Sequence, residues 1–214
     1  MLIKLSYLFK GFIALSAIIG ILLQCEVGTP QFSLASFRMF TTLSNLVVAL
    51  FFIAYLVIYS LKKKITNKEK KIIIYFKFMI SMSITLTGLV AHFMLKDMFT
   101  NMDTQAKLGL TLLHYVVPIS TILDWIIFDE KGNTDNKMPL FATIFPITYV
   151  AITMIAAQFM TGENKYPYPF LNIDMLGVSA VCINIFLLAI AFLTVGYLAV
   201  WLDHKLAQDN NKQA

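Results

Sequence analysis

Long apolar runs alternate with short polar segments along the whole chain. Six of these runs are close to or above the roughly 20 residues that a helix needs to cross the hydrocarbon core of a bilayer. A spanning segment must satisfy its own backbone hydrogen bonds, and the runs lack the strict alternation of barrel strands. The pattern therefore predicts an all-α polytopic bundle of six transmembrane helices, at about residues 7–25, 39–61, 72–94, 108–128, 139–160 and 175–202.

The composition agrees with this pattern and excludes an ordinary soluble fold. Of the 214 residues, 58% are hydrophobic and 14% are charged, whereas soluble domains average roughly 45–50% apolar and 25% charged residues. The polar stretches are too short for a separate soluble domain, so residues 1–214 are expected to form a single membrane domain. Cys25 and Cys182 show no disulfide or metal-ligand spacing, and no metal site or cofactor is predicted.

Basic residues gather in short bursts between the apolar runs, which indicates membrane orientation rather than nucleic-acid binding. Twelve of the 17 basic residues fall in the N-terminal segment, the loops after the second and fourth runs, and the C-terminal tail. Lys4 and Lys10 are counted with the N-terminal segment, ahead of the first run. The positive-inside rule then predicts that both termini are cytoplasmic. No signal-peptide cleavage site follows the first run, which is expected to persist as a helix.

A minority of polar side chains interrupts the predicted helices at the two ends of the bundle. A charge at the bilayer centre costs roughly 2.5–3.5 kcal/mol on insertion scales, so each such group needs a partner or a function. Lys77 and Asp124 fall at similar depth in the inner half, which predicts a structural ion pair, although Lys77 could instead extend to the interface. Along the third run, residues 77, 81, 85, 88 and 92 form one polar or small stripe, which favours a helix contact face.

The outer half of the predicted bundle collects the residues with the best claim to chemistry. Thr41 and Asn45 share one face of the second helix, and His92, His114 and Asp174 fall at compatible depth. A threonine hydroxyl attacks an acyl carbonyl only when a base removes its proton, and His114 is the candidate base. Asn45, His92 and Asp174 are candidate supporting or orienting groups. The alternatives are ordinary structural roles, since such threonines are often caps or packing groups and membrane histidines are often hydrogen-bonded core residues.

Three segments together resemble a known pattern: residues 37–45 (Phe-Arg-Met-Phe-Thr-Thr-Leu-Ser-Asn), 114–125 (His-Tyr-Val-Val-Pro-Ile-Ser-Thr-Ile-Leu-Asp-Trp) and 166–171 (Tyr-Pro-Tyr-Pro-Phe-Leu). They resemble the Pr6Pr family of bacterial six-span membrane proteins, over most of the chain. More distantly, the same places are similar to the androgen-induced protein family, multipass enzymes that hydrolyse fatty acid esters of hydroxy fatty acids with a threonine and a histidine. The resemblance implies Thr41 as nucleophile, with Thr42 as the fallback, and His114 as base.

Three functions stay open at this point. The first is an intramembrane threonine-dependent hydrolase of lipid or fatty-acyl esters, which would need no cofactor and no nucleic acid and would take a membrane lipid or lipid-like substrate. The second is a non-enzymatic transporter or small-ligand binding bundle, in which the same polar groups line a pathway. The third is a haem carrier with His92 and His114 as axial ligands. The family resemblance places the protein in a bacterial cytoplasmic membrane.

Overall fold

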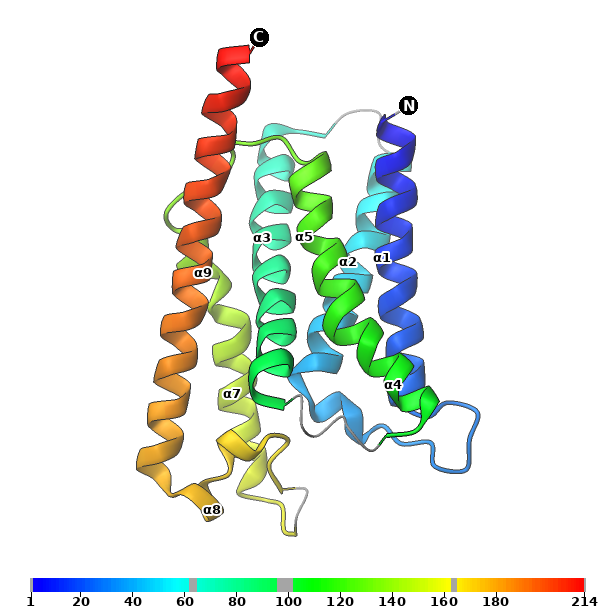
Figure 1. Cartoon of the computed structure of the whole chain (residues 1–214), viewed down its shortest axis with the longest axis vertical. Coiled ribbons are helices and arrows are strands. Elements are labelled where there is room, and N and C mark those ends of the chain that lie inside the picture. The colour runs from blue at the N-terminus through cyan, green and yellow to red at the C-terminus, as the bar shows by residue number, and fades with distance from the viewer. Residues whose placement is uncertain (1, 62–64, 96–101, 163–164, 214) are drawn as a thin grey trace. The chain divides into compact units, whose positions relative to one another are not determined.

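The computed structural model describes residues 2–61, 65–95, 102–162 and 165–213, with side chains up to residue 209 (Figure 1). These residues form helices and connecting turns, and none of them lies in a strand. The helical segments long and apolar enough to cross a membrane are Leu2–Gln24, Phe40–Leu61, Asn67–Leu95, Thr104–Phe128, Met138–Ala157 and Val178–Asp209. The predicted all-α fold with six membrane-spanning helices is confirmed, as expected of an integral membrane protein. The side on which the termini lie stays a prediction, and residues 62–64 and 96, whose lysines enter it, lie outside the described residues.

The chain divides into two compact units, Met1–Lys131 and Gly132–Ala214. The first unit holds four of the six spans and the second holds two. The elements of the first unit are α1 (Leu2–Gln24), η1 (Ala35–Arg38), α2 (Phe40–Leu61), α3 (Asn67–Val90), η2 (Ala91–Leu95), α4 (Thr104–Thr111), η4 (Leu112–Val116) and α5 (Val117–Phe128). Here η2 and η4 are single π-helical turns. The fourth span is therefore one continuous helical segment, α4–η4–α5, with a π turn in its interior.

Side-chain caps mark where the helices of the first unit begin. Thr66 and Glu69 form a reciprocal capping box at the start of α3, in which each side chain bonds the backbone of the other residue. Asp103 caps α4 by accepting a 2.8 Å hydrogen bond from the Ala106 amide. The polar segments between the apolar runs thus supply the groups that satisfy the open backbone donors at the helix starts.

Small residues bring the helices of the first unit into close contact. A side-chain carbon built at Gly20 of α1 would lie 2.6 Å from Leu113, and one built at Gly109 of α4 would lie 3.1 Å from Leu23. Gly88 of α3 is equally tight, because a carbon there would lie 3.0 Å from the carbonyl oxygen of His114. Membrane helices associate through such close backbone approach, since lipid provides no hydrophobic driving force between them. These contacts fix the π turn η4 between α1 and α3.

A charged network lies inside the first unit, within the spans. Asp124 of α5 is fully buried and accepts from Lys10 Nζ at 2.8 Å and from Lys77 Nζ at 2.6 Å. Lys77 also donates to Asp129, just after α5. The Lys77–Asp124 contact expected from depth is therefore present, with a second lysine added. Lys10 does not precede the first helix, because α1 begins at Leu2 and leaves Lys10 1% exposed inside it. Two ammonium groups and two carboxylates thereby join α1, α3 and α5.

The second unit contains α6 (Met138–Ala142), α7 (Ile144–Ala157), η6 (Pro169–Leu171), α8 (Ile173–Leu176) and α9 (Val178–Gln213). Asp203 of α9 is buried, and its Oδ2 accepts hydrogen bonds from the amides of Gly132 and Thr134 and from the Thr134 hydroxyl, at 2.9–3.1 Å. The backbone of Gly196 approaches Pro139 closely, because a side-chain carbon at position 196 would lie 3.0 Å from its ring. These contacts hold the segment leading into α6 against α9.

Candidate functional site

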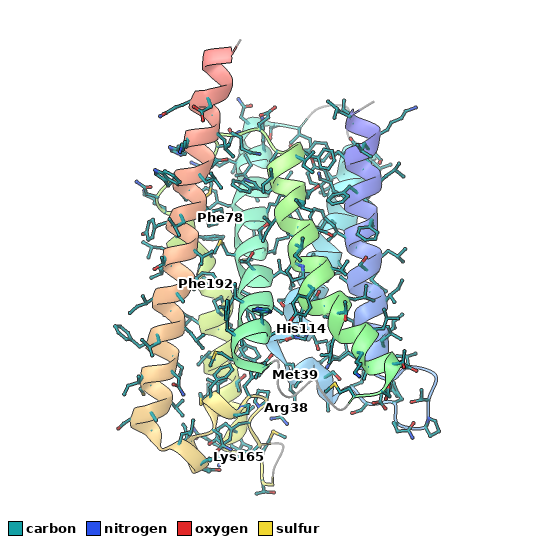
Figure 2. All side chains as sticks on the ribbon, in the orientation of Figure 1. Arg38, Met39, Phe78, His114, Lys165 and Phe192 are labelled. Atoms are coloured by element: carbon teal, nitrogen blue, oxygen red, sulfur yellow. The ribbon has the colours of Figure 1, made fainter. Side chains whose placement is uncertain are left out.

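A hydroxyl and an imidazole meet inside the first unit. Thr41 lies in the first turn of α2, and its Oγ1 is 3.2 Å from His114 Nε2 in η4. Both side chains are 5% exposed. Figure 2 shows His114 on the fourth span, near Met39, which directly precedes α2. The two residues nominated by sequence for nucleophile and base are thus in hydrogen-bond contact.

The other ring nitrogen of His114 decides which way the proton lies. His114 Nδ1 is 3.0 Å from the carbonyl oxygen of Leu110, one turn earlier in the fourth span. A carbonyl only accepts hydrogen bonds, so Nδ1 carries the proton of the neutral imidazole. Nε2 is then an unprotonated acceptor, and Thr41 is the donor of the bond between them. This is the arrangement in which an imidazole can take the hydroxyl proton of a nucleophile.

The π turn around His114 follows from the local sequence. Pro118 has no N–H, so the His114 carbonyl loses the hydrogen bond it would accept in a regular α-helix. The turn widens instead, and the Val117 amide donates to Leu112, five residues earlier. Gly88 accommodates this widening, since it offers no side chain where the His114 carbonyl approaches α3. The helix is thus irregular in the π turn immediately before Pro118, and such turns recur at functional sites.

Asn45 fastens the two halves of the site to each other. Its Nδ2 donates to the Thr41 carbonyl at 2.9 Å and to the Leu113 carbonyl at 3.2 Å. One amide group therefore holds the first turn of α2 and the π turn together. The neighbouring Ser44 donates from Oγ to the same Thr41 carbonyl at 3.1 Å, and its Oγ is 2.9 Å from Thr87 Oγ1 of α3. Asn45 occupies the supporting position that the sequence assigned to it.

His92 and Asp174 are placed differently from Asn45. His92 lies in η2 with an exposed side chain. Its described hydrogen bond joins Nδ1 to Tyr115 Oη at 3.4 Å, and not to Thr41 or His114, which together form the dyad. Asp174 belongs to the second unit, where it accepts from Lys165 at 2.7 Å. That hydrogen bond raises the pKa of Lys165 above its ordinary value. Of the three candidate supporting residues, Asn45 is the one whose described hydrogen bonds reach the backbone of Thr41 and of Leu113, next to His114.

Metal and haem ligation find no support in the arrangement of the described side chains. No three His, Cys, Asp or Glu residues gather in a metal-binding cluster within the described ranges. Both ring nitrogens of His114 contact hydrogen-bond partners, whereas His92 contacts Tyr115 through Nδ1. An axial haem ligand needs a nitrogen free to bind iron, and neither nitrogen of His114 is free, so this geometry does not favour a haem held by both histidines.

Two features of the polar interior were missed from sequence. Lys10 was grouped with the N-terminal segment, although its position inside an apolar stretch and the unbalanced charge of Asp124 pointed to a buried partner. The Leu110 carbonyl, which sets the imidazole proton, is a backbone group and leaves no signal in residue types.

Comparisons with protein-family models, curated proteins and solved structures find no match to the chain. Function is therefore argued from the geometry of this site.

Proposed function

We propose that the protein is an intramembrane hydrolase of fatty-acyl esters, with Thr41 as the nucleophile and His114 as the general base. The observation that carries the proposal is the buried 3.2 Å contact between Thr41 Oγ1 and His114 Nε2, with Nδ1 donating to the Leu110 carbonyl. A threonine held only for helix packing commonly bonds its own backbone, as Thr121 does with the Val117 carbonyl at 2.8 Å. Thr41 reaches a basic nitrogen on another helix.

The reaction follows from the direction of these hydrogen bonds. His114 Nε2 takes the Thr41 proton as Oγ1 attacks the ester carbonyl carbon, and a tetrahedral intermediate forms. The imidazolium, still bonded to Leu110 through Nδ1, then gives that proton to the departing alcohol oxygen. The acyl group is left on Thr41 as an ester, and water releases it as a carboxylic acid. Asn45 keeps the two reacting side chains in register through its bonds to Thr41 and Leu113.

The substrate class follows from the surroundings of the pair. Thr41 and His114 both lie within segments long and apolar enough to span a membrane, so the substrate must be soluble in lipid. The similarity of residues 37–45 and 114–125 to the androgen-induced protein family supports the same pair of residues and an acyl-ester substrate. We further propose that the chain belongs to the Pr6Pr family and resides in a bacterial cytoplasmic membrane.

The test is ester hydrolysis by the full chain purified in mixed micelles. With a fluorogenic acyl ester, Thr41→Ala and His114→Ala are each expected to lower the turnover rate at least about 100-fold, because each removes one partner of the proton transfer. His92→Ala is the matched control, since His92 also lies in a π turn of a span but its described hydrogen bond goes to Tyr115 rather than to Thr41 or His114. Its turnover rate should stay within about twofold of the parent's.

A covalent probe provides the second measurement. An alkyl fluorophosphonate should modify Thr41 in the parent protein and in His92→Ala, and should fail to modify His114→Ala. Turnover that survives in both dyad variants would refute the hydrolase.

A second candidate function is a non-enzymatic transporter or small-ligand binding bundle. The observation in its favour is the set of ionisable side chains inside the spans, where Lys10, Lys77 and Asp124 are 8% exposed or less at their side chains. Buried charges in membrane helices commonly line ion or substrate pathways. Ligand-dependent thermal stabilisation of a protein that the fluorophosphonate never labels would favour this candidate over the hydrolase.

A further inference from the structure

Unsatisfied buried polar atoms gather beside the dyad. Among the described residues, the buried side-chain nitrogen and oxygen atoms without a hydrogen-bond partner are Gln24 Oε1, Thr42 Oγ1 and Asn45 Oδ1. Gln24 ends α1, and Thr42 and Asn45 lie in the first two turns of α2, close to Thr41 and on the same side of it on the helix surface. Burying a polar atom without a partner is unfavourable, so such atoms normally bind water or a ligand. Their concentration at one place indicates a polar occupant there.

The orientation of the Asn45 amide is fixed by its neighbours. Its nitrogen faces the carbonyl oxygens of Thr41 and Leu113, which can only accept. Turning the amide over would place its oxygen against those two acceptors, so Oδ1 must be the atom that points away from them. Oδ1 is therefore an acceptor with 0% residue exposure that calls for a hydrogen-bond donor.

The hydrogen-bonding capacity of the orphaned atoms identifies the occupant. A fatty-acyl ester group has no O–H or N–H, so its ester oxygens cannot satisfy Asn45 Oδ1. A water molecule brings two donors and two acceptors. Thr42 and Asn45 are three residues apart and hence neighbours on the helix surface, with side chains about 5–6 Å apart at Cβ. One water can bond both Thr42 Oγ1 and Asn45 Oδ1 at this separation.

We propose that Thr42 and Asn45 hold the water that hydrolyses the acyl group on Thr41, an inference that rests on the proposed hydrolase function. The water oxygen bonds to the acyl carbonyl carbon while His114 Nε2 takes one of its protons. The resulting tetrahedral intermediate breaks its bond to Thr41 Oγ1, which receives that proton from His114. The products are the free threonine and a carboxylic acid, and no other reactant is needed. Thr42 and Asn45 are positioning residues in this step, because they act through the water.

The experiment separates acylation from deacylation. Parent protein, Thr42→Val and Thr42→Ser are mixed with a p-nitrophenyl acyl ester, and the acyl adduct on Thr41 is followed by intact-protein mass spectrometry. Valine keeps the shape of threonine but loses the hydroxyl, so acylation should change less than about threefold while deacylation slows at least about tenfold and the adduct accumulates. Serine restores the hydroxyl and should restore deacylation. Thr121→Val, at an equally buried threonine with a satisfied hydroxyl, should accumulate no adduct.

A stability measurement tests the water site without reference to catalysis. If a water bonds Thr42, Thr42→Val should lower the thermal midpoint of unfolding at least as far as Thr121→Val, by about 2–4 °C. If the hydroxyl has no occupant beside it, valine removes an unsatisfied polar atom and the midpoint should rise. A rise in the midpoint, or deacylation of Thr42→Val at the parent rate, overturns the inference. If neither the parent nor Thr42→Val forms an adduct, the hydrolase is refuted instead, and the midpoint alone then decides the water site.

Discussion

Asp124 provides a sharp test of what holds the first unit together. Its carboxylate is fully buried and accepts from two lysines, Lys10 at 2.8 Å and Lys77 at 2.6 Å. Asp124→Asn keeps the shape of the side chain but removes the charge that both ammonium groups face. Lys77 retains Asp129, whereas the other hydrogen bond described for Lys10 goes to the neutral hydroxyl of Ser6, at 2.8 Å. The variant therefore leaves a buried ammonium without a carboxylate partner.

The size of the effect follows from that imbalance. Removing one partner of a buried ion pair costs about 3–5 kcal/mol, because the remaining charge stays desolvated. We expect Asp124→Asn to lower the free energy of unfolding by this amount. Asp129→Asn should cost less than about 1 kcal/mol, since Asp129 is 26% exposed and Lys77 keeps Asp124. The double variant Lys10→Met with Asp124→Asn removes one charge of each sign, and should recover to within about 2 kcal/mol of the parent.

The measurement is an SDS unfolding titration of the parent and the three variants in mixed micelles, followed by far-ultraviolet circular dichroism. Asp124→Asn should be the least stable of the four proteins, with Asp129→Asn and the double variant both closer to the parent. A loss below about 1 kcal/mol for Asp124→Asn would show that Lys10 finds another partner or discharges, and would refute the network as the anchor. A double variant no more stable than Asp124→Asn would equally refute the charge-balance explanation.

Further predictions concern backbone approach, thiol reactivity and the second unit. Gly88→Ala places a carbon 3.0 Å from the carbonyl oxygen of His114 and should lower the rate of ester turnover about 10–100-fold. Gly11→Ala is the control, because open space surrounds Gly11 and turnover should not change. Equal turnover rates in the two variants would exclude tight packing at position 88. Burial raises the pKa of the Cys25 thiol and makes it less reactive. In a Cys182→Ala background, a water-soluble maleimide at pH 7.5 should therefore label the folded protein at least about tenfold more slowly than the SDS-unfolded protein. Equal labelling rates would show that the Cys25 thiol is accessible. Asp203→Ala removes the acceptor of three hydrogen bonds from Gly132 and Thr134 and should speed tryptic cleavage next to α6. An unchanged cleavage rate would show that these bonds do not hold the segment leading into α6 against α9.

The fold was predictable because the membrane imposes it through length and hydropathy. Each apolar run long enough to cross the bilayer appears as a helix in the structure. What these runs do not encode is the rotation of each helix about its axis, which decides the partners of a polar side chain. Lys10 illustrates this, since the sequence pattern counts it with the N-terminal segment while its side chain is paired with Asp124 inside the bundle. Residue types therefore predict the membrane fold, whereas the partners in the charge network depend on how the helices pack.

The candidate site was predictable to the same degree and for the same reason. Depth, residue chemistry and the family resemblance together nominated Thr41 and His114, and their side chains are in contact. Depth equally nominated His92, which lies in η2 and whose Nδ1 is 3.4 Å from Tyr115 Oη. The π turn and the Leu110 carbonyl, which give His114 its direction, depend on backbone geometry that a side-chain pattern does not contain. The sequence thus identifies candidate residues by their depth in the predicted spans. The structure selects among them by the direction in which each side chain leaves its helix.

The two polar clusters of the first unit lie at opposite ends of the same helices, and this separation has a mechanical consequence. Lys10 joins the charge network near the start of α1, whereas Gln24 ends that helix beside the start of α2. At 1.5 Å per residue, these positions are about 21 Å apart along the helix. Strong ionic bonds fix α1, α3 and α5 at one end, while the dyad end is held by neutral hydrogen bonds and glycine contacts. Neutral bonds are weaker and easier to break, so local opening is expected at the dyad end, and in the proposed hydrolase this opening would admit the substrate. The ionic anchor then keeps the helices assembled while Thr41 becomes accessible.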